Sequence, residues 1–163
     1  QPLDVGLRGS APFHWDGSLA DMSALMGEVF SRRMGGSLQS AARVQAIDDF
    51  VATFRPPAPH RSPMDEAAVR GKALFESSAV GCASCHSGSR FSDNVTVDIG
   101  RGDSPTQTPS LLGVAYRAPF MHDGCAATLR ERFEPKCGGT EHGNVENLSP
   151  AALDDLIAYL ESL

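Results

Sequence analysis

Two cysteines and a histidine form a short motif whose residue types and spacing point to a cofactor. The motif is Cys82-x-x-Cys85-His86. Two thiols at this separation can bond to the two vinyl groups of one haem, and the adjacent histidine then lies beneath the iron as its proximal ligand. We therefore predict one covalently attached haem c, held by Cys82 and Cys85, with His86 bound to the iron.

The chain contains four cysteines, so other uses of the thiols must be weighed. A thioredoxin-like redox pair requires a βαβ context, which the helical pattern of this chain does not provide. A zinc site that recruits Cys125 and Cys137 would need shorter spacings than this second pair has. In an oxidising compartment, Cys125 and Cys137 instead predict a disulfide, with two buried free thiols as the alternative.

Helices must position these residues, because the chain has no alternating strand pattern of useful length. Apolar spacing predicts helices over residues 18–33, 40–54, 62–77 and from 149 onward. Ser62 and Ser149 each precede a proline, which is a typical N-cap arrangement. The helix over residues 62–77, directly before the motif, should bury Val69, Leu74 and Phe75. The fold class is predicted to be mostly α.

An internal repeat predicts how the chain is divided. Residues 11–17 (APFHWDG) align with residues 118–124 (APFMHDG), and a helix, a Gly-Gly loop and a closing helix follow each copy. The proline-rich residues 55–63 form a linker. We predict that residues 1–58 are the back half of a first cytochrome-like repeat without a haem motif. Residues 59–163 then form a complete c-type cytochrome domain.

Composition excludes some classes of function. The 163 residues carry a net charge of −6 and are 41% hydrophobic, which suits one domain or two small ones with a real core. The acidic balance argues against a nucleic-acid surface. The apolar stretches are too short to span a bilayer. We expect any export signal to lie outside this chain.

Several motifs together resemble the bacterial di-haem cytochrome c peroxidase and MauG superfamily. They are the attachment motif, residues 108–112 (TPSLL), residues 118–124, residues 127–129 (ATL) and the first copy at residues 13–17. The resemblance implies two class I cytochrome folds side by side, of which the second is complete here. It does not imply peroxidase activity, because peroxidases of this family need two haems and this chain can attach only one.

The sixth iron ligand has two candidates. In class I cytochromes this ligand usually comes from the loop before the closing helix, which favours His142. Met121 is the alternative, and its thioether would raise the reduction potential. An open site is the third option. The neighbouring His122 is expected to be structural.

Other residues are expected to surround the cofactor. Aromatic side chains should exclude water from the haem, and arginines are suited to pair with its propionates. The aromatic residues are Phe75, Phe91 and Phe120, and the arginines are Arg90, Arg101 and Arg117. Trp15 is expected to pack between the two parts of the chain.

Together these features predict electron transfer through one six-coordinate haem, as a module of a larger redox protein. The partner would be a redox protein or an upstream haem domain, in the periplasm or another extracytoplasmic compartment. The alternative is a fragment of a di-haem peroxidase or MauG-like oxidase that acts on peroxide. A haem-based sensor is a third option. A strong sixth ligand favours electron transfer, and an open site favours peroxide or gas chemistry.

Overall fold

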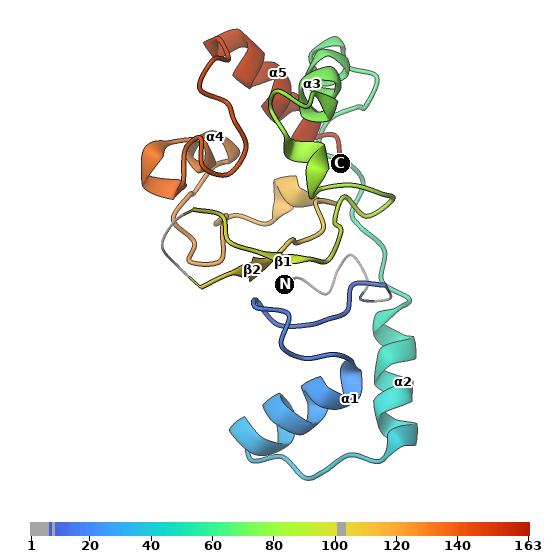
Figure 1. Cartoon of the computed structure of the whole chain (residues 1–163). Coiled ribbons are helices and arrows are strands. Elements are labelled where there is room, and N and C mark those ends of the chain that lie inside the picture. Colours follow the sequence, from blue (N-terminus) through green and yellow to red (C-terminus); the bar gives the residue numbers. More distant parts are fainter. Residues whose placement is uncertain (1–6, 8, 101–103) are drawn as a thin grey trace.

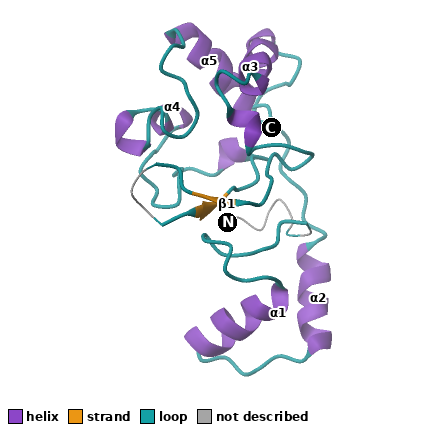
Figure 2. Cartoon of the chain, in the orientation of Figure 1, coloured by secondary structure: helices purple, strands orange, loops and turns teal. Residues whose placement is uncertain are grey.

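Helices gather at the two ends of the molecule, with long loops and a small sheet between them (Figures 1 and 2). The computed structural model describes residues 7, 9–100 and 104–163. This arrangement confirms the mostly helical fold class. No helix in the described part of the chain combines the length and the apolar character that a bilayer crossing requires.

The first helical group contains a helix that changes type along its length. The α-helix α1 (Met22–Leu25) continues as a π-helix (Met26–Arg33), and α2 (Ala41–Val51) packs beside it. The carboxylate of Asp21 caps α1 by accepting a hydrogen bond from the amide of Ala24. The predicted start at residue 18 is wrong, because Leu19 pairs its backbone with Phe13 and is not free to become helical.

The second helical group is built on the crossing of α3 (Glu66–Glu76) and α5 (Pro150–Leu160). Gly71 lies at the crossing, and a Cβ atom there would be 1.9 Å from the carbonyl oxygen of Asp155. Phe75 of α3 and Tyr159 of α5 stack edge to face, with ring centroids 5.2 Å apart. The backbones of the two helices therefore approach closely where α3 has no side chain.

The ends and faces of these helices differ in part from the sequence prediction. The α5 helix begins as predicted, because the Ser149 hydroxyl accepts a hydrogen bond from the amide of Ala152. The α3 helix begins later than predicted, since its cap is Asp65 and not Ser62. The prediction that Val69 is buried is also wrong, because its side chain is 52% exposed, whereas Phe75 is buried.

The two aligned segments have the same local backbone structure. Each begins with a cis Ala-Pro bond and closes with an antiparallel bridge, Phe13 to Leu19 and Phe120 to Ala126. The residue after each phenylalanine has a left-handed backbone, with φ of 77° at His14 and 70° at Met121. The similarity of the two sequences is thus a similarity of two turns. The larger division at residues 58 and 59 stays a prediction.

Short strands in the middle of the molecule connect the two parts. Strand β1 (Thr96–Val97) pairs with β2 (Thr106–Gln107) in antiparallel register. The amide of Gln107 donates to the carbonyl of Trp15 at 2.7 Å, and the Thr96 hydroxyl donates to the carbonyl of Asp16 at 3.1 Å. The Trp15 ring meets the His122 ring at 6.3 Å, so the two aligned turns touch each other directly.

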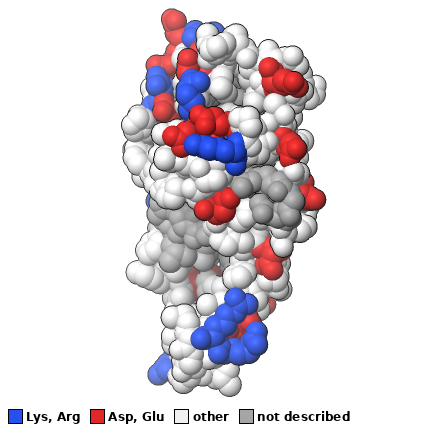
Figure 3. Space-filling view, turned by 90° about the vertical axis from the view of Figure 1, so that its left-hand side faces the viewer, with Lys and Arg blue, Asp and Glu red and all other residues white. Residues whose placement is uncertain are grey.

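Surface charges of opposite sign lie close together. Glu28 pairs with Arg32 and Arg33 near one end, and Lys136 pairs with Glu131 and Glu134 near the other. Figure 3 shows basic side chains beside acidic ones on both parts of the face in view. Such mixed charges are unlike the basic surface that nucleic acids require.

Candidate haem-attachment site

The attachment motif forms one tight turn directly after α3. Residues Cys82–Ser84 form a 3-10 helix that follows Gly81, whose φ of 82° only glycine adopts without strain. The amide of His86 donates to the carbonyl of Cys82 at 3.0 Å. Cys82 and Cys85 are half-buried free thiols. Both thiols and the histidine therefore belong to a single turn, as haem attachment requires.

His86 is held in the form that binds a metal. Its side chain is buried, and Nδ1 lies 3.0 Å from the carbonyl oxygen of Phe91. When Nδ1 donates its hydrogen to this carbonyl, the lone pair of Nε2 is left for a metal. Burial lowers the pKa of His86 from its ordinary value, which keeps the imidazole neutral. The left-handed backbone of Phe91 (φ 52°) forms the turn that presents the carbonyl.

His142 lies opposite His86. The ring centroids are 6.0 Å apart and the ring planes are inclined by 31°. Because a metal–imidazole bond is about 2 Å long, two imidazoles on opposite sides of one metal have centroids roughly 6 Å apart. At this separation His86 and His142 would be able to hold one iron between them.

The loop that carries His142 lies against the attachment motif. The amide of Asn144 donates to the carbonyl of Val80 at 2.9 Å. A Cβ atom on Gly143 would be 3.6 Å from the sulfur of Cys82. Met121 lies in the turn at residues 118–124, where its carbonyl accepts a hydrogen bond from Gly124. The structure therefore places the ring of His142 near that of His86. Met121 makes its backbone hydrogen bond within its own turn.

The predicted aromatic residues share one core with the motif. Phe75 and Phe120 are buried in this core, and Phe91 and Cys82 pack against it. The Phe75 and Phe91 rings are 6.2 Å apart. An apolar wall therefore lies beside the attachment turn, where it would exclude water from a bound haem.

The Arg117 side chain and the backbone of Arg90 both contact Ser110. Arg117 donates through Nη1 to the carbonyl of Ser110 at 2.6 Å, and the Ser110 hydroxyl donates to the carbonyl of Arg90 at 2.7 Å. Arg101 lies outside the described residues. The role of these arginines toward propionates stays a prediction.

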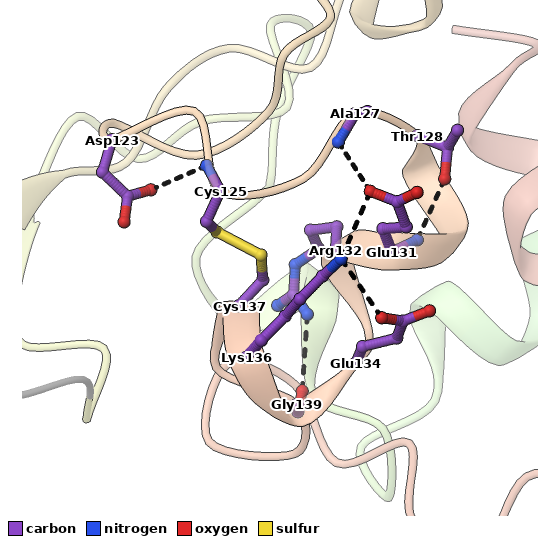
Figure 4. The surroundings of a disulfide bond; sticks show 10 residues. All are labelled: Asp123, Cys125, Ala127, Thr128, Glu131, Arg132, Glu134, Lys136, Cys137 and Gly139. Atoms are coloured by element: carbon purple, nitrogen blue, oxygen red, sulfur yellow. Dashed lines mark hydrogen bonds and ion pairs between the residues drawn. A yellow bond between two sulfur atoms is a disulfide. The ribbon is translucent and has the colours of Figure 1, made fainter.

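The predicted disulfide is present. Cys125 and Cys137 are bonded, with Cα atoms 5.8 Å apart (Figure 4). Cys137 is fully buried in the core and immediately precedes Gly138, so the bond anchors the start of the loop that carries His142.

Sequence reasoning missed Arg132. Its guanidinium is buried and donates to the carbonyls of Gly139, at 3.4 Å, and of His142. Figure 4 shows this side chain reaching toward Gly139 beside the disulfide. Arginines on short, charged helices are usually exposed, and no local pattern marks this one as buried. Only the folded loop identifies it.

Comparisons with known proteins place the chain in a family. Residues 70–156 match the family described as di-haem cytochrome c peroxidase. The chain is 34% identical to the methylamine utilization protein MauG of Methylorubrum extorquens, over 61% of this chain and 36% of that protein. It is 28% identical to the cytochrome-c peroxidase IdrP1 of Denitromonas iodatirespirans, over 63% of this chain and 42% of that protein. The chain thus spans less than half the length of these two relatives.

Solved structures extend the similarity of fold to the whole chain. A chain of the hydrazine synthase of Kuenenia stuttgartiensis, studied under 20 bar of xenon, superposes with a TM-score of 0.82. The match covers 100% of this chain and 71% of that chain at 21% identity. A MauG-like protein associated with microbial copper homeostasis superposes with a TM-score of 0.64 at 19% identity, over 94% and 71% of the two chains. The family match over residues 70–156 includes the attachment turn, and it shows that this chain belongs to the di-haem cytochrome c peroxidase family.

Proposed function

We propose that this chain is the part of a di-haem peroxidase or MauG-like redox protein that carries one c-type haem and passes electrons through it. The observation that carries the proposal is the attachment turn, with buried His86 facing His142 at 6.0 Å. The sequence favoured an electron-transfer module and held the di-haem enzyme as its alternative. Membership of the family supports the alternative more strongly, so we place the electron-transfer role inside such an enzyme.

Each residue of the site has a distinct role in this proposal. Cys82 and Cys85 would form the thioether bonds, His86 would bind one face of the iron, and His142 would bind the other, with Met121 as the alternative. The haem supplies one-electron transfer when bound. The Phe91 carbonyl holds the proton of His86 on Nδ1, and the buried core beside the turn keeps water away.

A second haem would belong to another part of the protein. The family is described as di-haem, and this sequence contains a single Cys-x-x-Cys-His motif. The turn at residues 11–17 copies the turn at residues 118–124. We therefore propose that residues 1–58 complete a first cytochrome-like unit whose attachment motif lies outside this chain. That upstream haem domain, or a separate redox protein, would be the electron partner.

The compartment is proposed from the chemistry of the cysteines. A disulfide between Cys125 and Cys137 is typical of oxidising surroundings. Together with covalent haem attachment, this favours the periplasm or another extracytoplasmic compartment.

The absorption spectrum of the reduced protein, with and without carbon monoxide, tests the proposed ligation. We expect a low-spin haem that binds carbon monoxide poorly. The His142→Ala variant should become high-spin and bind carbon monoxide readily, whereas Met121→Ala should keep the wild-type spectrum. A sulfur-to-iron charge-transfer band in the spectrum of the oxidised protein that disappears only in Met121→Ala would make Met121 the ligand. A high-spin wild-type haem would contradict both and would assign the peroxide chemistry to this haem.

A further inference from the structure

We infer that Arg132 is a positioning residue that holds His142 at the sixth-ligand position of the haem. The inference rests on the proposed ligation by His142 and goes beyond it, because it names what keeps that side chain in place.

Arg132 binds two backbone carbonyls of the loop that precedes Gly143. Nη1 donates to the carbonyl of Gly139, and Nη2 donates to the carbonyl of His142 itself (Figure 4 shows the first of these). A guanidinium presents five donors in a fixed plane, so it can bind two carbonyls at once without rearrangement. The bond to its carbonyl ties the backbone of His142 directly to Arg132.

The base of Arg132 is itself fixed. It is the last residue of α4 (Leu129–Arg132), whose first turn is closed by two hydrogen bonds of Glu131. The Thr128 hydroxyl accepts from the amide of Glu131 at 3.1 Å, and the Glu131 carboxylate accepts from the amide of Ala127 at 2.9 Å. The guanidinium also lies 4.7 Å above the ring of Phe133. Because α4 is anchored in this way, Arg132 holds the loop that carries His142 in place relative to α4.

The loop around His142 is rich in glycine. It contains three glycines with left-handed backbones, at residues 138, 139 and 143, and glycine gains the most freedom when restraints are removed. Its start is held by the disulfide at Cys137, and its end by the bond from Asn144 to Val80. His142 lies between these anchors, where the two bonds from Arg132 act.

Variants of Arg132 in the haem-loaded protein separate positioning from general stability. Arg132→Met should keep the covalent haem but convert much of it from low-spin to high-spin. Carbon monoxide should then bind faster, on the order of tenfold, which is the effect of losing charged hydrogen bonds. Arg132→Lys keeps the charge but has no planar fork, and it should give an intermediate spin-state mixture. Arg130→Met is the matched control: it removes an exposed arginine of the same helix, whose partner is Asp154, and should leave the spectrum unchanged.

The outcomes distinguish this inference from the proposed ligation. If His142→Ala becomes high-spin but both Arg132 variants stay low-spin, the ligation stands and the positioning role of Arg132 is overturned. If Arg132→Met changes only the reduction potential, its charge acts on the haem and the positioning role is also overturned. If His142→Ala keeps the wild-type spectrum, both ideas fail. Should Arg132→Met not fold, the mixture in Arg132→Lys decides the question.

Discussion

At the scale of single residues, the ability of this site to bind iron depends on which nitrogen of His86 carries the proton. The carbonyl of Phe91 accepts from Nδ1 at 3.0 Å, so Nε2 is left to the metal. That carbonyl is placed by a left-handed residue in the loop after the motif. The Cys-x-x-Cys-His spacing predicts the ligand, but the orientation of the ligand comes from a residue outside the motif.

The cysteine pair of the motif gives the most direct prediction. Intact-mass spectrometry of the wild-type chain should show the polypeptide plus one haem, because two thioether bonds survive denaturation. The double variant Cys82→Ala with Cys85→Ala should have the mass of the polypeptide alone. Ser84→Ala, which changes an exposed hydroxyl in the same turn, is the control and should keep the haem. A wild-type mass without haem would refute the cytochrome interpretation.

Asp16, in the first of the two matching turns, gives a prediction about pH. Hydrogen bonds from Ser18, and a weaker one from His14, lower the pKa of Asp16 from 3.8 to about 2. A carboxylate with a lowered folded-state pKa stabilises the protein above its unfolded pKa, and this stabilisation is lost as the pH falls toward 2. The stability deficit of Asp16→Asn should therefore be present at neutral pH and shrink below pH 3.8. NMR titration of the Asp16 carboxyl checks the cause, and a midpoint near 3.8 would contradict it.

At the scale of elements, two Ser-Pro pairs that both predict the start of a helix have different outcomes. Ser62 and Ser149 both precede a proline, yet only Ser149 caps a helix. In the other case, Asp65 accepts from the amides of Ala67 and Ala68 and starts α3 three residues later. Aspartate is at least as good a cap as serine, so the nearer signal decides where the helix begins.

Because α3 and α5 approach closely at Gly71, one methyl group added there should strongly lower the free energy of unfolding. Gly71→Ala would place Cβ 1.9 Å from the Asp155 carbonyl oxygen, so the helices must separate. We expect a loss of about 2 kcal/mol in the free energy of unfolding, as in other overpacked cores. Gly27→Ala is the matched control, because nothing lies within 4 Å of its new Cβ. In that helix alanine should be neutral or stabilise by about 0.5 kcal/mol. Urea unfolding of both variants measures the difference, and equal stabilities would contradict the close crossing.

At the scale of the whole molecule, the two helical groups are joined through loops and the small sheet. Gln107 is central to this junction, since its side chain is buried and its Nε2 donates to the carbonyls of Ser10 and Asn94, each at 3.4 Å. Asn94 in turn donates to the carbonyl of Gly9 at 3.0 Å. Because these bonds connect residues far apart in sequence, the two parts are expected to unfold together.

Gln107→Ala tests this coupling. It removes the hydrogen bonds to the carbonyls of buried Ser10 and half-buried Asn94, which costs about 1–3 kcal/mol. The fluorescence of Trp15, the only tryptophan, reports on the junction, where its ring meets that of His122, and far-UV circular dichroism reports on all helices. The two unfolding transitions should coincide in the wild type and separate in Gln107→Ala. Gln45→Ala, which removes an exposed bond to Asp49 within α2, is the control and should leave them coincident. Separate transitions in the wild type would show that the parts are independent.

The sequence by itself determined the features that depend on short spacings. These are the attachment motif, the mostly helical class, the α5 cap at Ser149, the similarity of the two turns, the cysteine pair and the family. Local chemistry is sufficient for each of them, since a motif, a cap or a turn involves only neighbouring residues. The preference for His142 was also available from its place before the last helix, with Met121 as the alternative ligand.

The tertiary structure decided what depends on distant segments. It brought His142 against His86, buried Arg132 under the loop, and turned Val69 outward although its residue type favours burial. It also showed that residue 18 does not start a helix, because Leu19 is paired with Phe13. In each case the outcome depends on which loop packs over which helix. Side-chain type and spacing along the chain do not by themselves fix that packing, because it depends on how distant segments close around the core.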